Sequence, residues 1–231
     1  MLQSFRLLVY NKYMYNLPTK KLILLKSIAI IVVVFGIISS FFIGFNIVYT
    51  RTYVNGRSML PTLNSSLDAT NTRDVIYINK FANVKPNDIV VLDLRSNPNF
   101  GGYAVKRLIA NPGDIVNIVF DGDSLQYNVL VNGKIFYSKP FKTFGYNTYD
   151  SFVQYVATHQ DDTTRIAKDE NQNVVGIMIK QNEVFVLGDN WDVSKDSALV
   201  GPLKENSIVG RVDIVVNPHQ NEFAQILKRI F

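Results

Sequence analysis

A stretch of 24 residues without a single charged side chain, residues 27–50, constrains this chain more than any other feature. The stretch is rich in Ile, Val and Phe. As an α-helix it would be about 36 Å long, against a bilayer hydrocarbon core of roughly 30 Å. A buried helix of a soluble domain usually keeps a polar stripe, and this stretch has none. It therefore predicts one transmembrane helix.

A cleaved signal peptide is the main alternative for the same stretch. Its apolar region has about 7–15 residues and ends at small residues that form a cleavage site. The stretch here is longer and runs into Asn46, Tyr49, Arg51 and Tyr53. This favours an uncleaved signal-anchor helix over residues 27–50.

The formal net charge of +5 lies before this span. Residues 1–26 hold five basic side chains and no acidic one, which leaves 19 basic and 19 acidic residues after position 50. Basic flanks are retained on the cytoplasmic side. We therefore expect a cytoplasmic tail at 1–26 and an extracellular domain at 51–231, attached to the cell membrane by a single pass. A domain with balanced charge argues against binding of nucleic acid.

Residues beyond the span alternate between short apolar runs and turn residues, which is typical of an all-β domain. Asn132-Gly133 predicts a type I′ hairpin turn, and Pro112-Gly113 suits a type II turn. The predicted fold is mainly β: an antiparallel β-sheet domain with an inserted small subdomain, preceded by one transmembrane helix. The insertion is the polar stretch of about 140–172, with one short helix, and residues 222–231 could form an amphipathic turn. The predicted strands lie at 74–81, 88–94, 103–109, 114–120, 127–138, 174–189 and 207–216.

The chain has no cysteine and two histidines, which removes disulfides, thiolate chemistry and a multi-histidine metal centre. Any chemistry has to use hydroxyls, amines, carboxylates and the backbone. The alternating oxygens of 192–196 resemble the start of a calcium loop, but Ser197 stands where glycine is needed and Leu203 where glutamate is needed. We expect no metal and no cofactor.

Three short segments stand out by residue type: 56–62 (GRSMLPT), 105–114 (VKRLIANPGD) and 188–197 (GDNWDVSKDS). Taken singly, each has an ordinary structural reading: a turn serine, a lysine that extends its amine to the surface, and a polar loop. Together, in this order and after a membrane anchor, they resemble the signature boxes of bacterial type I signal peptidases, which read SMxPT, KRxxxxPGD and GDNxxxSxDS.

This resemblance implies a membrane-bound serine endopeptidase that cleaves N-terminal signal peptides from exported preproteins outside the membrane. Its expected partners are preproteins and the lipid bilayer, with proximity to the secretion translocon. A non-catalytic, membrane-tethered β-domain that binds exported proteins is the alternative. A self-cleaving repressor-type Ser/Lys protease would carry a DNA-binding domain in place of the span.

The expected catalytic pair is Ser58 as nucleophile and Lys106 as general base. His159 lies in the insertion and His219 near the C-terminus, so a Ser-His pair does not fit the boxes. A lysine amine has an ordinary pKa of about 10.4, so it can accept a proton near neutral pH only if burial lowers that pKa. Arg107 would point to the other face of the same strand.

The resemblance also assigns supporting roles. Ser194 would orient the lysine amine, Asp196 would support its loop, and Asp189 and Asn190 would form a structural turn. The oxyanion would be held by the Ser58 backbone N–H and by the residue two before it, which here is Gly56. The preference of family members for small side chains in the substrate implies two shallow apolar pockets, and an extended substrate would add to an exposed strand edge. The matching pocket positions, for which core packing is the other reading, are Val54, Met59, Leu63 and Val105.

Two positions depart from the family pattern. Trp191 and Ala198 stand where the last box commonly has arginines. Loss of the second arginine removes an ion-pair partner for an acidic side chain such as Asp196. Lys195 or Arg211 would then have to replace it, or the pair is absent.

Overall fold

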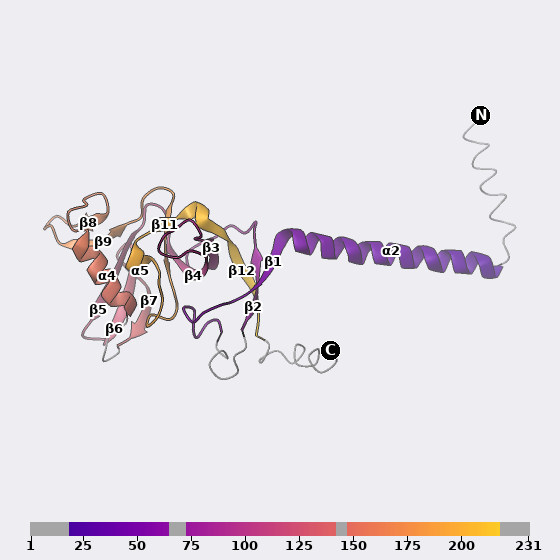
Figure 1. The fold of residues 1–231 in the computed structure, drawn as a ribbon, viewed down its shortest axis with the longest axis horizontal. Helices are drawn as coiled ribbons and strands as arrows, with labels where there is room; N and C mark the ends of the chain where they lie inside the picture. The colour runs from indigo at the N-terminus through magenta and orange to yellow at the C-terminus, as the bar shows by residue number, and fades with distance from the viewer. Residues whose placement is uncertain (1–18, 65–72, 142–146, 218–231) are drawn as a thin grey trace, which may run out of the picture. The chain divides into compact units, whose positions relative to one another are not determined.

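The computed structural model describes residues 19–64, 73–141 and 147–217. The chain divides into two compact units, residues 1–48 and residues 49–231. In the first unit, helix α2 (Thr19–Val48) includes a stretch, Lys21–Val48, that is long and apolar enough to cross a membrane by length and composition (Figure 1). The helix begins before the predicted position 27 and ends before position 50. Tyr49 and Thr50 belong instead to strand β1, because they pair with Asn79 and Ile78.

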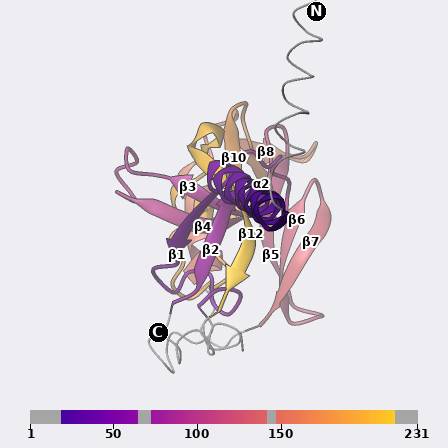
Figure 2. The same ribbon diagram turned by 90° about the vertical axis from the view of Figure 1, so that its right-hand side faces the viewer.

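The second unit contains two antiparallel sheets. The larger sheet has the order β1-β2-β12-β3-β4-β10-β11 and the smaller sheet β7-β6-β5-β9-β8. The strands of the larger sheet are β1 (Tyr49–Tyr53), β2 (Val75–Asn79), β3 (Ile89–Asp93), β4 (Tyr103–Ala110), β10 (Glu183–Leu187), β11 (Leu203–Lys204) and β12 (Ile208–Val216). The strands of the smaller sheet are β5 (Ile115–Asp121), β6 (Gln126–Val131), β7 (Lys134–Pro140), β8 (Ile166–Lys168) and β9 (Val174–Met178), of which β5, β6 and β7 run side by side in Figure 2.

The mainly antiparallel β fold confirms the predicted class. The two predicted turns lie where the sequence placed them: Asn132 and Gly133 join β6 to β7 with φ of 52° and 75°, and Gly113 has φ of 91°. A side chain at a glycine with positive φ is strained, which explains why glycine occupies both turns. The turn at Gly113 leads from β4 of the larger sheet into β5 of the smaller sheet.

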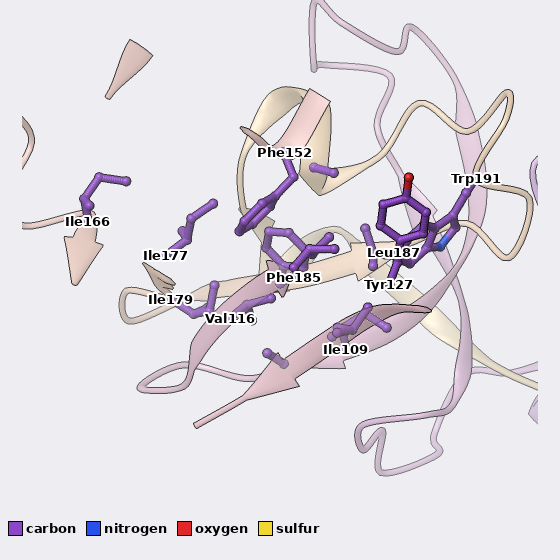
Figure 3. Close-up of a cluster of buried hydrophobic side chains, with 14 residues drawn as sticks. Ile109, Val116, Tyr127, Phe152, Ile166, Ile177, Ile179, Phe185, Leu187 and Trp191 are labelled. Atoms are coloured by element: carbon purple, nitrogen blue, oxygen red, sulfur yellow. The ribbon is translucent and has the colours of Figure 1, made fainter. Parts of the chain in front are cut away.

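The stretch 140–172 contains helix α4 (Asn147–Thr158) and strand β8. Phe152 of α4 lies in the largest cluster of buried side chains, where its ring meets that of Phe185 edge-on at 6.3 Å. Figure 3 shows this cluster, which also holds Ile109 of β4 and Trp191 of the loop after β10. The helix is thus part of the core that supports β4 and β10. The amphipathic segment predicted at 222–231, like His219, lies outside the described residues.

Candidate active site

Lys106 is a buried lysine in the middle of β4. Only 4% of its surface is exposed, and its Nζ donates a hydrogen bond to Ser194 Oγ at 3.2 Å. Ser194 belongs to the loop that follows β10 and is itself 2% exposed. This contact joins the second and third sequence segments in space.

Burial lowers the pKa of the Lys106 amine below its ordinary value, because the charged form loses hydration. The carboxylates of Asp196 and Asp189 act in the opposite direction and have the smaller influence. At a given pH, more of this amine is therefore neutral than in an exposed lysine. A neutral amine is the form that can accept a proton.

Asp196 supports the same loop and is fully buried. Its carboxylate accepts from the backbone N–H of Gly188 at 2.9 Å and from that of Ala198 at 3.1 Å, where it caps the short helix α5 (Ser197–Val200). Burial raises the pKa of this carboxyl, while hydrogen bonds from Gly188 and Ser194 lower it. These contacts make one buried hydrogen-bond network of Lys106, Ser194 and Asp196.

The backbone of Ser58 lies close to this network at Gly188. The Ser58 carbonyl accepts from the Asn190 N–H at 2.9 Å, and it would lie 2.5 Å from a Cβ placed on Gly188. The side chain of Ser194 crowds the same point. Only glycine fits between them, so Gly188 is where residues 54–62, called the serine loop below, meet the loop that contacts Lys106.

Arg107 points away from Lys106, as strand alternation predicts. Its guanidinium forms a two-point ion pair with Asp189, with Nε at 2.8 Å from Oδ1 and NH2 at 2.6 Å from Oδ2. The Thr62 hydroxyl also donates to Asp189, and the Lys139 amine donates to its backbone carbonyl at 2.8 Å. Asp189 therefore links β4, the serine loop and β7.

Gly56 has φ of 107°, with open space where a Cβ would stand. The backbone conformation, and not crowding, is therefore what favours glycine at this position. A serine or threonine here would have to adopt a strained conformation to present its hydroxyl.

The four predicted pocket residues lie close together in the structure. Val54, Met59 and Leu63 belong to one buried cluster, and Val105 packs against it. The first three are at most 3% exposed. They pack in the core against residues of β2 and β3, which is the core-packing reading of these positions.

The two departures from the family pattern are core residues. Trp191 is 1% exposed, donates from Nε1 to the Tyr137 hydroxyl at 3.1 Å, and lies in the same cluster as Ala198, which is fully buried. Neither basic replacement meets Asp196 in the described contacts. The Lys195 amine lies over the ring of Phe100. The guanidinium of Arg211 binds two other carboxylates, those of Asp213 and Asp88.

Sequence reasoning missed Asn64, Thr62 and Lys139. Asn64 is fully buried and donates from Nδ2 to the carbonyls of Val54 and Gly56 at 2.9 and 3.0 Å. A polar side chain in a polar stretch gives no sign of such contacts, since their partners are set by the tertiary fold. The one available signal was the position of Asn64 two residues after the segment 56–62.

The fold and these contacts define an antiparallel β protein in which a buried lysine lies beside a serine-bearing loop. A family model described as "Signal peptidase, peptidase S26" matches residues 22–217. Signal peptidase IB of Staphylococcus aureus strain Mu50 is 33% identical over 186 residues, which is 80% of this chain and 84% of that protein. Signal peptidase I of Bacillus caldolyticus is 30% identical over 173 residues, 72% of this chain and 78% of that protein. The chain belongs to the signal peptidase family, peptidase S26.

A crystal structure of a signal peptidase I from Enterococcus faecalis V583 also matches, with 23% identity and a TM-score of 0.33. The match covers 57% of this chain and 97% of that chain.

Proposed function

We propose that this chain is a membrane-anchored serine endopeptidase that cleaves signal peptides from exported preproteins, with Ser58 as nucleophile and Lys106 as general base. The observation that carries the proposal is the buried Lys106 amine, with its lowered pKa and its hydrogen bond to Ser194 beside the serine loop. The names of the relatives, signal peptidases IB and I, support the choice of substrate.

In the first half of the reaction, the neutral Lys106 amine takes the proton of the Ser58 hydroxyl as Ser58 Oγ attacks the scissile carbonyl. The resulting oxyanion would accept hydrogen bonds from the backbone N–H groups of Ser58 and Gly56. Neither N–H has an acceptor among the described residues. The tetrahedral intermediate then breaks its C–N bond, and the protonated Lys106 gives its proton to the departing amine of the mature protein.

In the second half, a water molecule replaces the departed amine. Lys106 takes a proton from this water, which attacks the ester between Ser58 and the signal peptide. The C–O bond of the ester breaks, and the proton returns to Ser58. Ser194 and Asp196 keep the Lys106 amine in one orientation during both halves of the reaction. Asp189 and Asn190 form the turn that supports the serine loop.

The pairing register of β4 supports an extended mode of substrate binding. Residues 103–107 pair with β3, whereas the pairing with β10 begins only at Arg107. Residues 103–106 therefore have one edge without a strand in the described part of the chain. An extended peptide could add there through backbone hydrogen bonds. Its small side chains would then pack against the apolar side chains of Val54, Met59, Leu63 and Val105.

The distribution of basic residues supports the topology. Five Lys and Arg residues precede the uncharged stretch 27–50, and two, Arg51 and Arg57, follow closely after it. The tail would stay in the cytoplasm, and the β domain would lie outside the cell membrane, where translocated preproteins emerge from the translocon.

The test is cleavage of a preprotein in detergent by the wild type and by Ser58→Ala and Lys106→Ala. We expect each variant to lose activity by about a thousandfold or more, because catalytic residues that work together lose most of their effect when one of them is removed. Ser96→Ala and Lys134→Ala, at exposed positions, are matched controls that should keep full activity. Near-normal activity of either site variant would end the Ser/Lys proposal, and an inactive wild type would favour a binding module.

A further inference from the structure

Two asparagine side chains hold the backbone of the serine loop from opposite ends. Asn64 Nδ2 donates to the carbonyls of Val54 and Gly56. Asn190 donates from Nδ2 to the carbonyl of Arg57 at 3.0 Å and from its backbone N–H to that of Ser58. Four carbonyls of a five-residue segment are therefore bound to asparagines.

The direction of these carbonyls decides where the N–H groups of the loop point. In a trans peptide unit the carbonyl and the following N–H point in opposite directions. The bond from Asn190 to the Arg57 carbonyl therefore turns the Ser58 N–H away from Asn190. Asn64 binds the carbonyls of Val54 and Gly56, whose peptide units lie on either side of the unit that carries the Gly56 N–H. It therefore holds this N–H from both sides, at a residue with φ of 107° and no side chain of its own.

Asn64 is itself held rigidly. It is fully buried, and it forms a reciprocal pair with Asp74: its N–H donates to Asp74 Oδ2, and its Oδ1 accepts from the Asp74 N–H, both at 2.7 Å. Its φ of 61° lies in the left-handed region, which asparagine tolerates better than most residues. Asp74 directly precedes β2, so Asn64 ties Gly56 to the larger sheet.

We infer that Asn64 is a positioning residue of this active site, which acts by fixing Gly56 so that the N–H groups of Gly56 and Ser58 converge on the oxyanion. The inference rests on the proposed function, because it presumes attack by Ser58. Asn64 contacts none of the reacting atoms. Its contribution is therefore to the stability of the tetrahedral intermediate and not to binding of the unreacted substrate.

Two variants remove the contact in different ways. Asn64→Gly deletes the amide and keeps the left-handed backbone accessible. Asn64→Asp keeps the size and the acceptor for the Asp74 N–H, and replaces the donor by a carboxyl oxygen that faces the carbonyls of Val54 and Gly56. If the glycine variant does not fold, the aspartate variant is judged by the same readouts. Asn128→Ala is the matched control. Asn128 is a buried asparagine of β6 that accepts a hydrogen bond from the Ser138 hydroxyl. It belongs to the smaller sheet, whereas the serine loop follows β1 of the larger sheet.

The readout compares two peptides of identical sequence, one ending in an aldehyde and one in the corresponding alcohol. The aldehyde can form a tetrahedral adduct with Ser58, whereas the alcohol binds only as a ground state. We expect the Asn64 variants to lose about tenfold or more in kcat and in affinity for the aldehyde, since loss of one oxyanion donor costs about 100- to 1,000-fold. Affinity for the alcohol should stay within about twofold.

Circular dichroism establishes that each variant is folded at the assay temperature. The control Asn128→Ala should lower the melting temperature and leave kcat and the preference for aldehyde over alcohol unchanged. If the folded Asn64 variants also kept kcat and this preference, Asn64 would be a purely structural residue and the inference would be wrong. A wild type that shows no preference for the aldehyde, or a Ser58→Ala variant that keeps it, would instead overturn the proposed function.

Discussion

At the scale of single residues, the proposed chemistry depends on an amine that is hidden from water. Lys106 is a buried residue of β4, and its amine donates a hydrogen bond to the Ser194 hydroxyl. A lysine amine in water carries a proton near neutral pH and so cannot serve as a base there. The environment of Lys106, and not its type, is what suits it to the role.

The rate should therefore depend on pH through Lys106. We expect kcat to fall as pH drops through the pKa of this amine, because the protonated form cannot accept the Ser58 proton. Since burial lowers that pKa, the fall should occur at a lower pH than for an ordinary lysine. The measurement is kcat on a preprotein peptide from about pH 5 to about pH 10, with folding monitored at each pH. A constant rate into the mildly acidic range, in folded protein, would contradict Lys106 as the base.

Gly188 gives a second prediction at this scale. A Cβ in the Gly188→Ala variant would lie 2.5 Å from the Ser58 carbonyl oxygen and would meet the side chain of Ser194. One of the two has to move, so we expect kcat to fall by about a hundredfold and the unfolding free energy by about 1–3 kcal/mol. Gly122→Ala is the control, because nothing lies within 4 Å of the added methyl group. Equal activity of the two variants would mean that the serine loop is not held at Gly188.

At the scale of elements, helix α4 illustrates support without direct participation. Its Phe152 contributes to the core below β10 and β4, while Thr148 N donates to the Trp191 carbonyl at 3.0 Å. The helix thus stabilises the end of the loop that carries Ser194. This explains how a polar insertion can matter to a fold whose site residues all lie elsewhere.

Phe152→Ala should destabilise the protein and leave its chemistry intact. Loss of a buried phenylalanine costs about 3–5 kcal/mol. At a temperature where the variant is folded, kcat should equal that of the wild type. Val153→Ala, on the exposed side of the same helix, should change the unfolding free energy by no more than about 0.5 kcal/mol. Thermal unfolding and kcat measured together test this, and a large loss of kcat in folded Phe152→Ala would give α4 a role in the site.

The sequence predicted elements wherever a repeating local signal was present. Short apolar runs rich in β-branched residues predicted β2, β3, β4 and β5, and Asn132-Gly133 predicted the hairpin of β6 and β7. The short strands β8 and β11 gave no such signal, since three and two residues are too few for a pattern. Strand β1 was missed because Tyr49 and Thr50 continue an uncharged stretch, and only pairing with β2 makes them a strand.

The sequence likewise indicates some residues of the candidate site and not others. The residue types of Ser58, Lys106, Ser194 and Asp196 stand in recognisable segments, so the sequence alone is enough to indicate them. Asn64 gives no such indication, because its proposed positioning role rests on contacts with backbone atoms ten and eight residues earlier in the chain. The packing of Trp191 and Ala198 was equally hidden, since their positions suggested charge and their surroundings are apolar.

At the scale of the whole molecule, the proposed function assigns anchoring to the apolar helix and chemistry to the β unit. The charge of the chain follows this division, since the excess of basic residues lies before the uncharged stretch 27–50. We expect protease added to intact cells to cut within residues 51–231. If these residues stayed intact while an external control protein was cut, the proposed orientation would be wrong.

The most direct test of the central claim is to identify the residue that becomes acylated. A serine-directed acylating reagent is added to the folded protein near neutral pH, and the labelled peptide is identified by mass spectrometry. The Ser/Lys proposal predicts one label, on Ser58, and none at this position in folded Lys106→Met, which lacks the base. A label on another residue, or labelling of Ser58 at the wild-type rate in Lys106→Met, would contradict it.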